Sequence, residues 1–377
     1  MAKAEHARNT EHPLALGSFC CWLALLARSG GIDRAYLPRT LFVTATTLLT
    51  SPLRLWEQLR HGRQVKRTRV HPSPIFIIGH WRSGTTYLHN LLCQDASLGF
   101  VSTFQTMAPG FCLVGNGAIK RRLAKLARAR YPTRLIDNIP LDLDAPQEDE
   151  FAIANMMPLS FLHGFTLPRR AEANFARSVL FEGVSERTLA RRLRAHTTLL
   201  RKATIRSGGR RLVLKNCASS GHVKALLKIF PDARFIHIHR NPYHVFLSTV
   251  HMYETVLPRS QLQTIGADHV EACVLRFYEK LLRAYLNDRS AIPPGQHVEI
   301  RFEELEHAPL EQLKRVYDTL GLPGFAEAKG HLQAHIDSVA DYRKNTYQLS
   351  AHTIEAVNRH WAFALEQWGY TRLEPAG

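Results

Sequence analysis

One segment of the chain combines the residue types that bind a phosphate. It runs from Pro74 to Thr86 and reads PIFIIGHWRSGTT. An apolar run, a glycine-bounded loop and a helical pattern follow one another, so backbone N–H groups and a positive helix dipole should face one anion. Gly79 and Gly84 keep the G-x-x-x-x-G spacing of nucleotide P-loops, but Thr85 stands where those loops carry lysine. The segment therefore predicts a site for a phosphorylated nucleotide that is not used as a triphosphate.

The same loop carries a fixed charge and several hydroxyl donors. Arg82 supplies a guanidinium, which can hold an anion through two parallel hydrogen bonds. The other donors are the backbone and side chains of Ser83, Gly84, Thr85 and Thr86. The alternative interpretation is a tight turn between a strand and a helix that binds no ligand.

A second group of polar residues follows another buried segment, Arg234–His239. Arg240 comes directly after this predicted strand, and Ser248 lies eight residues further along, inside the next predicted helix. Open α/β sheets bind ligands at the carboxyl ends of their strands, so Arg240 should face a ligand there. About two helical turns separate it from Ser248. Both residues can flank one phosphate only if the strand end lies beside that helix.

Together these two segments resemble those of the sulfotransferases that use 3′-phosphoadenylyl sulfate (PAPS), and most closely the broad bacterial branch of that family. The resemblance covers roughly residues 74 to 345. It implies that the loop from Arg82 to Thr86 binds the 5′-phosphosulfate, and that Arg240 and Ser248 bind the 3′-phosphate. It also implies a late basic segment on the 3′ side, for which Arg343 and Lys344 are the candidates.

The reaction that the resemblance implies is transfer of a sulfuryl group to a hydroxyl acceptor. PAPS carries several anionic groups, so two separate anion sites suit it. A sulfuryl group carries less negative charge than a γ-phosphoryl group, so neither magnesium nor the P-loop lysine is required. Catalysis then depends on in-line positioning and on stabilising charge at the bridging oxygen. We expect Arg82 and Lys215, which ends another predicted strand, to supply that stabilising charge.

The acceptor hydroxyl also needs a base. Members of the family carry a histidine shortly after a strand-end lysine, but Cys217 and Ser219 occupy the two corresponding positions here. Glu148 and Glu150 are the acidic candidates, in a cluster where like charges would raise one pKa toward neutrality. The alternative is a charged helix N-terminus that complements the helix dipole. His80, inside the loop, is a further candidate for the base.

A parallel sheet is needed to position these segments. Arg210–Lys215 and Arg234–His239 read as buried strands with a helix at Val223–Phe230 between them, which is a β-α-β unit. A further strand is expected over His297–Phe302. Further helices are expected over 119–131, 148–157, 186–206, 243–253, 268–288, 309–320, 325–338 and 352–367. The predicted fold is α/β: a P-loop-like three-layer fold with a central parallel sheet and extra helices.

The first 70 residues are expected to form an N-terminal helical segment, and residues 71–377 the sulfotransferase domain. Two apolar stretches, 13–27 and 41–49, are each shorter than the ~20 residues of a membrane-spanning helix. They form either a pair of core helices or an interfacial hairpin at the periphery of a membrane. The second interpretation is helped by the basic residues that follow: Arg60, Arg63, Lys66, Arg67 and Arg69.

The charge balance favours an anionic partner. Lys and Arg number 49 against 32 Asp and Glu, so the net charge is +17. An anionic cosubstrate, an acidic membrane surface and nucleic acid all fit this balance, as do solvated arginine-rich helices. No binding motif with interleaved aromatics supports nucleic acid. The alternative enzyme class is a P-loop kinase-like phosphotransferase, against which the missing lysine and the lack of a Walker-B aspartate argue.

The cysteines and histidines predict no metal site. Six cysteines have neither pair nor ligand spacing, which indicates reduced thiols in a cytoplasmic protein. His237 and His239 share one face of a predicted strand, where ordinary polar residues are commoner than metal ligands. The oligomeric state cannot be inferred from these features.

The acceptor is predicted from apolar residues on either side of the acidic cluster. These residues are Phe104, Met107, Phe111, Met156, Met157 and Phe161. Together with the apolar N-terminal stretches, they favour a hydrophobic alcohol such as a lipid.

Overall fold

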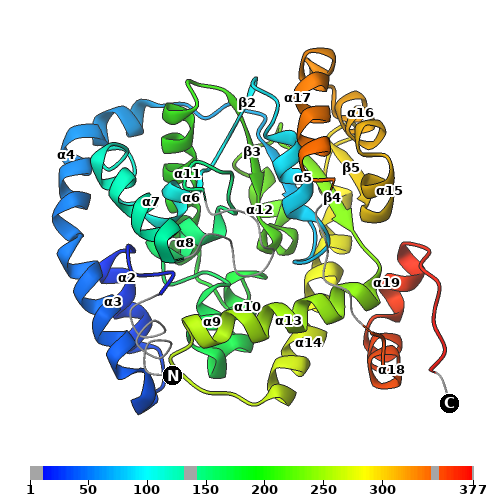
Figure 1. Ribbon diagram of the computed structural model, residues 1–377, viewed down its shortest axis with the longest axis horizontal. Helices are drawn as coiled ribbons and strands as arrows, with labels where there is room; N and C mark the ends of the chain where they lie inside the picture. The colour runs from blue at the N-terminus through cyan, green and yellow to red at the C-terminus, as the bar shows by residue number, and fades with distance from the viewer. Residues whose placement is uncertain (1–11, 131–141, 341–347, 376–377) are drawn as a thin grey trace. The chain divides into compact units, whose positions relative to one another are not determined.

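The computed structural model of the chain describes residues 12–130, 142–340 and 348–375 (Figure 1). The described residues group into two compact units, each made of three segments of the chain. One boundary between the units falls after Val70. The first unit comprises Met1–Val70, Val101–Gly209 and Met252–Gly266. The second unit comprises His71–Phe100, Arg210–His251 and Ala267–Gly377.

A five-stranded parallel sheet forms the centre of the second unit, with the strand order β2-β3-β1-β4-β5. Its strands are β1 (Ile75–Ile78), β2 (Leu98–Phe100), β3 (Arg211–Lys215), β4 (Arg234–His239) and β5 (His297–Arg301). All four residues of β1 are buried, and β1 pairs with both β3 and β4. The expected β-α-β strands are therefore not neighbours. A strand that is apolar on both faces fits the middle of a sheet covered by helices on each side.

The second unit also contains helices that follow the strands in sequence. They are α5 (Thr85–Leu92), η3 (Cys217–Gly221), α12 (Val223–Leu227), α13 (Pro242–Ser260), α14 (Ala267–Asp288), η4 (Arg289–Ala291), α15 (Phe302–His307), α16 (Pro309–Leu320), α17 (Phe325–Ser338), α18 (Ala351–His360) and α19 (Ala362–Gln367). Only α13 is shared, since its residues from Met252 onward belong to the first unit.

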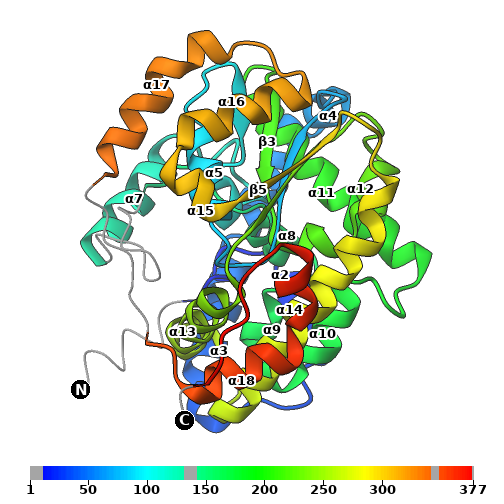
Figure 2. The ribbon, with the colours of Figure 1, turned by 90° about the vertical axis from the view of Figure 1, so that its right-hand side faces the viewer.

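Helices cover both faces of the sheet. Figure 2 shows α5, α15 and α16 on one side of the strands and α12 and α14 on the other. Ile77 of β1 packs in one core with Leu88 of α5 and Val316 of α16. On the opposite face, Phe76 stacks on Phe235 with ring centroids 5.5 Å apart. This α/β arrangement with a central parallel sheet confirms the predicted fold class.

The first unit is helical. Its helices are α2 (Phe19–Ala27), η1 (Arg34–Tyr36), α3 (Leu37–Leu49), α4 (Ser51–Arg67), α6 (Thr103–Met107), α7 (Ala118–Arg130), α8 (Glu150–Met156), α9 (His163–Thr166), η2 (Pro168–Arg170), α10 (Ala171–Ser178) and α11 (Glu186–Arg206). Trp22 and Leu25 of α2 pack with Val43 of α3 in one apolar cluster. Phe104 and Phe111 form a second cluster. Within the described residues, no helix combines the length and the apolar character needed to cross a membrane.

Several predicted helices have the bounds expected of them, and others differ for local reasons. The helices at 186–206, 309–320 and 325–338 are as predicted. The helix expected over 352–367 is broken at Trp361, whose backbone leaves the helical region at φ −118°. This indole is buried, and its N–H donates a hydrogen bond to the Leu275 carbonyl at 2.9 Å. The helix expected to end at residue 253 continues to Ser260 and includes Pro258.

Candidate active site

Three parallel strands end at one edge of the sheet, and the predicted anion-binding residues follow them. β1 leads into the loop 79–84, β3 ends at Lys215, and β4 leads into Arg240. The register pairs Ile77 with Lys215 and Ile78 with His237. Because all three strands run in the same direction, the loop, Lys215 and Arg240 lie at the same edge.

Two glycines shape the loop between β1 and α5. Gly79 has a φ of +140° and Gly84 a φ of +95°, a region that favours glycine. A Cβ on Gly79 would lie 2.3 Å from the carbonyl oxygen of Ile238, and a Cβ on Gly84 would lie 2.1 Å from Cδ2 of Phe302. Only glycine fits at either position. The loop backbone therefore runs directly against β4 and the start of α15.

Arg82, Arg240 and Ser248 come together beside this loop. The Arg82 Nε donates a hydrogen bond to the Ser248 Oγ at 2.9 Å. The Arg240 Nη1 donates to the backbone carbonyl oxygen of Arg82 at 3.5 Å. The end of β4 thus lies beside α13, which is the condition under which Arg240 and Ser248 can flank one phosphate. Two guanidinium groups and a hydroxyl in one place form a site suited to an anion with several charges.

Two residues that were not predicted from the sequence, Phe302 and Glu303, hold the end of β4. The Arg240 guanidinium lies over the Phe302 ring, 4.5 Å from its centroid. The Asn241 N–H donates to the Glu303 Oε1 at 3.0 Å, and the Asn241 Oδ1 accepts from the N–H of Tyr243 at 3.0 Å. Phe302 and Glu303 directly follow the last strand, β5, and this position is the signal that would have identified them.

The remaining predicted loop residues form the start of α5. Gly84 is the N-cap of this helix. Ser83 and Thr85 are buried and Thr86 is half-buried. The Thr85 Oγ1 lies 3.6 Å from the Cys217 Sγ. Since the first N–H groups of a helix have no partner within it, the N-terminus of α5 offers donors to a phosphate in this loop.

The segment after β3 supports the loop from its other side. Lys215, at the end of β3, is only 5% exposed. The Gly79 N–H donates a hydrogen bond to the Ser220 Oγ at 2.8 Å, and Ser220 belongs to η3. Ser220 was not predicted from the sequence. Its place in a polar turn just after a buried strand is a weak signal that many structural turns share.

His80 points into the protein interior. Its Nδ1 lies 2.7 Å from the carbonyl oxygen of Trp81, and its ring centroid lies 4.8 Å from that of Tyr278. Burial lowers the pKa of His80 to about 3. The imidazole is therefore neutral at physiological pH, and it is a very weak base for an acceptor hydroxyl.

Glu150, one of the predicted acids, is held by partners within the first unit. Its Oε1 accepts hydrogen bonds from the Ser160 Oγ at 2.6 Å and from the Phe161 N–H at 3.1 Å. Its Oε2 accepts from the Arg192 Nη2 at 2.8 Å, and both side chains of this ion pair are buried. Both oxygens of Glu150 are thus occupied by structural contacts.

Asp149, which lies between the two glutamates in sequence, also contacts α11. The Asp149 Oδ2 lies 2.6 Å from the His196 Nε2, so two of the acids have a basic partner on the same helix. Glu148 is buried, and its N–H donates to the Gln147 Oε1 at 2.9 Å. The cluster is therefore not a group of unbalanced like charges, as the sequence pattern suggested. No signal close to residues 148–150 indicates this, because the partners lie more than 40 residues away.

His237 and His239 belong to an aromatic stack in the second unit. The His237 ring stacks on Tyr285 at 3.8 Å, and its Nδ1 lies 3.0 Å from the Glu299 Oε1. The His239 Nδ1 lies 2.9 Å from the Tyr370 hydroxyl. Burial lowers the pKa of both imidazoles. In the part of the chain that the structure describes, no group of three His, Cys, Asp or Glu side chains is placed to hold a metal ion.

The predicted acceptor-side residues divide into core and half-buried side chains. Phe104, Phe111 and Phe161 are buried in the first unit, so they are core residues. Met107, Met156 and Met157 are half-buried. The predicted residues Arg343 and Lys344 lie outside the described residues.

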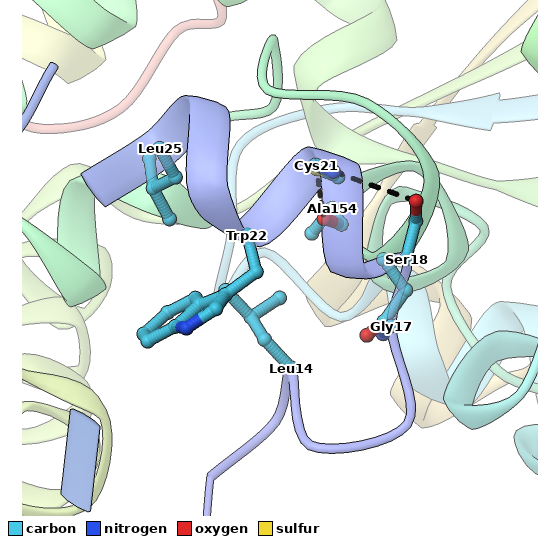
Figure 3. Close-up of a pocket in the computed structure, with 8 residues that line it drawn as sticks. Leu14, Gly17, Ser18, Cys21, Trp22, Leu25 and Ala154 are labelled. Carbon is cyan, nitrogen blue, oxygen red and sulfur yellow. Dashed lines mark hydrogen bonds between the residues drawn. The ribbon is translucent and has the colours of Figure 1, made fainter. Parts of the chain in front are cut away.

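Figure 3 shows a small pocket along α2 in the first unit. It is lined by Leu14, Gly17, Ser18, Cys21, Trp22, Leu25, Ala154 and Asn155. The Cys21 thiol donates to the Ala154 carbonyl oxygen at 3.6 Å, and burial raises the pKa of this thiol to about 12. A protonated thiol is a poor nucleophile, and no carboxylate or imidazole lines the pocket. It is therefore no candidate for catalysis.

The chain is similar to known proteins over almost its whole length. Residues 74–327 match the model of the family described as "Sulfotransferase family". The chain is 31% identical over 371 residues to an omega-hydroxy-beta-dihydromenaquinone-9 sulfotransferase, Stf3, from Mycobacterium bovis and from Mycobacterium tuberculosis. The match covers 98% of this chain and 94% of the relative. A match of this extent favours a sulfotransferase over the kinase and nucleic-acid alternatives.

Two solved structures share the fold. The chain resembles sulfotransferase STF9 from Mycobacterium avium with a TM-score of 0.70 and 20% identity, over 96% of this chain and 98% of that one. It resembles sulfotransferase STF1 from Mycobacterium tuberculosis with a TM-score of 0.69 and 18% identity, over 91% and 92%. At these identities the likeness supports the fold alone.

Proposed function

We propose that this chain, which belongs to the bacterial sulfotransferase family, transfers the sulfuryl group of PAPS to a hydroxyl group of a lipid. The observation that carries the proposal is the meeting of Arg82, Arg240 and Ser248 beside the loop 79–84. Residues 71–377 remain the proposed sulfotransferase domain, and the family match over 74–327 supports this.

The loop and the end of β4 would bind different parts of the nucleotide. We propose that Ser83, Gly84, Thr85 and Thr86 bind the 5′-phosphosulfate at the N-terminus of α5. Arg240 and Ser248 would bind the 3′-phosphate, with Arg343 and Lys344 contributing on the same side. Arg82, whose side chain contacts Ser248, would join the two halves of the site.

The proposed reaction is an in-line displacement at sulfur. The acceptor oxygen attacks the sulfur, the bond from sulfur to the bridging oxygen breaks, and adenosine 3′,5′-bisphosphate leaves. Arg82 and Lys215 would stabilise the charge that develops on the bridging oxygen. No metal is required for this step. The hydroxyl proton has to pass to a base as the new bond forms.

We propose Glu148 as that base. Asp149 and Glu150 each have a basic partner on α11, and both oxygens of Glu150 accept structural hydrogen bonds. His80 is buried among aromatic rings, with a pKa far below neutrality. Of the candidates that the sequence offers, Glu150 and His80 are thus the weaker ones, and the base proposal stays with Glu148.

The acceptor proposal rests on the relative. Its name gives a hydroxylated dihydromenaquinone as the acceptor, and the match covers 98% of this chain. We therefore propose a hydroxyl on a hydrophobic, quinone-like lipid as the acceptor class. We also propose a cytoplasmic location, which the free state of all six cysteines supports.

The donor is tested by thermal shift. Adenosine 3′,5′-bisphosphate should raise the melting temperature in the absence of magnesium, because a ligand that binds only the folded state stabilises it. Arg240→Ala should weaken bisphosphate binding about 10- to 100-fold, since a hydrogen bond to a charged group is worth about 1.5–3 kcal/mol. Arg359→Ala, which removes an exposed arginine, is the matched control. A shift with Mg·ATP and none with the bisphosphate would overturn the proposal.

The acceptor is tested in the same preparation with sulfur-labelled PAPS. Labelled donor is incubated with a bacterial lipid extract, with sugars or with both, and the products are separated by polarity. We expect label in the lipid fraction only. Label in the sugars alone would contradict the lipid acceptor and leave the donor assignment intact.

A further inference from the structure

Helices α2, α3 and α4 expose large apolar side chains to solvent. Figure 1 draws these helices in blue, next to one another in the first unit. The exposed side chains are Leu23, Leu37, Leu41, Leu48, Leu49, Leu55, Trp56 and Leu59. Leu49 is 76% exposed and Leu59 77%. Among the described residues, the other exposed large hydrophobic side chain is Leu126, on α7.

Three of the four exposed leucines of α3 lie on a single face. Leu37, Leu41 and Leu48 follow the spacing i, i+4, i+11, which places them along one stripe of a helix. The opposite face is the packed one, and it contains Val43 and Thr47, both fully buried. α3 therefore turns a leucine stripe outward.

The first half of helix α4 has the reverse of the usual amphipathic arrangement. Leu55, Trp56 and Leu59 point outward, whereas Glu57 is buried and bonded to Lys202. Arg54 is half-buried and donates to the carbonyl oxygen of Thr47 in α3. A surface helix normally buries its apolar face and exposes its charges. Here the charged residues hold the helix to the unit, and the apolar residues are left for something else to cover.

Cations continue this surface along α4. Arg60, Arg63, Lys66 and Arg67 are all exposed in the last two turns of the helix. The only acidic residue between 34 and 70 is the buried Glu57. We call the side chains Leu37, Leu41, Leu48, Leu49, Leu55, Trp56, Leu59, Arg60, Arg63, Lys66 and Arg67 the α3–α4 face. Along the chain it is apolar as far as Leu59 and cationic from Arg60, and residues 34–70 contribute no exposed acidic side chain to it.

We propose that the α3–α4 face binds the surface of an anionic lipid bilayer. Leucines and one tryptophan would enter the interfacial region while the arginines contact lipid phosphates, as amphipathic helices at membranes do. Charge complementarity selects this occupant. A second copy of the chain docked through the same face would bring its cations against themselves, which is unfavourable. A helix that lies on a membrane does not need the length of a spanning helix.

Trp56 provides a built-in reporter of this contact. It is 50% exposed, whereas the other four tryptophans of the chain are each at most 9% exposed. Entry into the lipid interface should therefore shift the emission of one tryptophan to shorter wavelength. Lipids brominated on their acyl chains should quench the same signal. Trp56→Phe should keep most of the binding and lose the shift.

The experiment mixes the full chain with vesicles of phosphatidylcholine, with or without phosphatidylglycerol, and measures co-sedimentation and Trp emission. We expect binding to the anionic vesicles that weakens at high salt. Arg60→Gln/Arg63→Gln/Arg67→Gln should weaken binding about 100-fold, because each basic residue near an anionic surface contributes about a factor of five. Leu55→Ser/Leu59→Ser should also weaken it and reduce quenching.

A triple variant of the second unit is the matched control for charge. Lys314→Gln/Lys329→Gln/Arg359→Gln removes the same number of exposed cations and should leave vesicle binding unchanged. An equal loss in this control would overturn the proposal in favour of diffuse attraction. Absence of binding to anionic vesicles would overturn it as well. A dimer in lipid-free solution that Leu55→Ser/Leu59→Ser dissociates, without vesicle binding, would assign the face to a second copy.

Vesicle binding needs neither donor nor acceptor, so it is tested independently of the sulfotransferase reaction. Vesicle binding without transfer of label would support the membrane proposal for the α3–α4 face and contradict the proposed function. Transfer of label to dispersed lipid without vesicle binding would support the proposed function and contradict the membrane proposal.

Discussion

Arg82 places its charge in the loop by means of an unusual backbone conformation. Its φ of +70° lies in the left-handed region, which costs a residue with a Cβ about 1–3 kcal/mol. A glycine at this position would remove that cost and also remove the guanidinium that bonds Ser248. We infer that the backbone strain is retained because it directs the side chain toward Ser248 and the proposed anion site.

The assignment of the base leads to a prediction at the residue scale. Glu148→Gln should lower kcat about 100- to 10,000-fold, the usual contribution of a general base, with little change in bisphosphate binding. Glu150→Gln leaves the buried Arg192 without its charged partner, and breaking such a pair costs about 3–5 kcal/mol. This variant should therefore lose stability first. Steady-state kinetics and urea unfolding on both variants separate the two roles.

Two outcomes would contradict that assignment. Wild-type kcat in Glu148→Gln would remove Glu148 from the mechanism. A loss of bisphosphate binding as large as the loss of kcat would show that the variant disturbs the donor site instead. Melting temperatures of both proteins serve as the control for folding.

At the scale of elements, the loop can approach α15 this closely only because Gly84 carries a hydrogen atom where other residues carry a Cβ. Gly84→Ala should destabilise the protein by more than about 1–3 kcal/mol, because it adds backbone strain at φ +95° to a clash with Phe302. Adding Phe302→Ala to the Gly84→Ala variant should recover the part of the lost stability that is due to the clash. Gly330→Ala is the matched control. Gly330 lies inside α17 with open space around it, so alanine there should stabilise by about 0.5–1 kcal/mol.

Urea unfolding of the four proteins measures these differences. Equal stability of Gly84→Ala and the wild-type protein would mean that the loop can move away from α15. In that case the close approach of Gly84 to Phe302 would not be what positions Arg240.

The basic partners of the acidic cluster lie on helix α11, and the sequence predicts them only in part. Arg192, His196 and Lys202 lie on its buried face together with Leu199 and Ala203. Cations within an apolar stripe are a visible signal of buried ion pairs. Which carboxylates they meet depends on packing between helices far apart in sequence, and no local pattern contains that information.

At the scale of the whole molecule, buried neutral histidines predict a loss of stability in acid. Burial lowers the pKa of His12 and His80 to about 3 and that of His163 to about 4, below the unfolded value of 6.5. Below pH 6.5 the unfolded chain therefore binds more protons than the folded one. The stability that these groups provide is complete above pH 6.5 and is lost as the pH falls toward 3–4.

The size of this effect can be measured. At pH 5.5 each of the three histidines should cost about 1.4 kcal/mol relative to pH 7.5, or about 4 kcal/mol together. His80→Asn should reduce the loss by about a third. His360→Asn, at an exposed position, should leave it unchanged. Urea midpoints at the two pH values test this, and equal stability at both would contradict it.

How much of the molecule the sequence predicts depends on how far apart the interacting residues are. The loop 79–84 and the Arg240–Ser248 segment could be proposed as a site because each is a short run of consecutive residues with a distinctive pattern. β2 was missed because its three residues, Leu98–Phe100, are too few to show a period. The position of β1 between β3 and β4 was missed because strand order is decided by long-range packing, not by neighbouring residues.

That strand order also has a consequence for the synthesis of the chain on the ribosome. β1 leaves the ribosome before either of its partners exists, since it pairs only with β3 and β4. From Ile78 to Lys215 translation takes on the order of 10 seconds at about 5–20 residues per second. During that interval the nascent chain carries an unpaired segment of four apolar residues. The strand that leads into the loop 79–84 thus stays without its partner strands until most of the first unit has been translated.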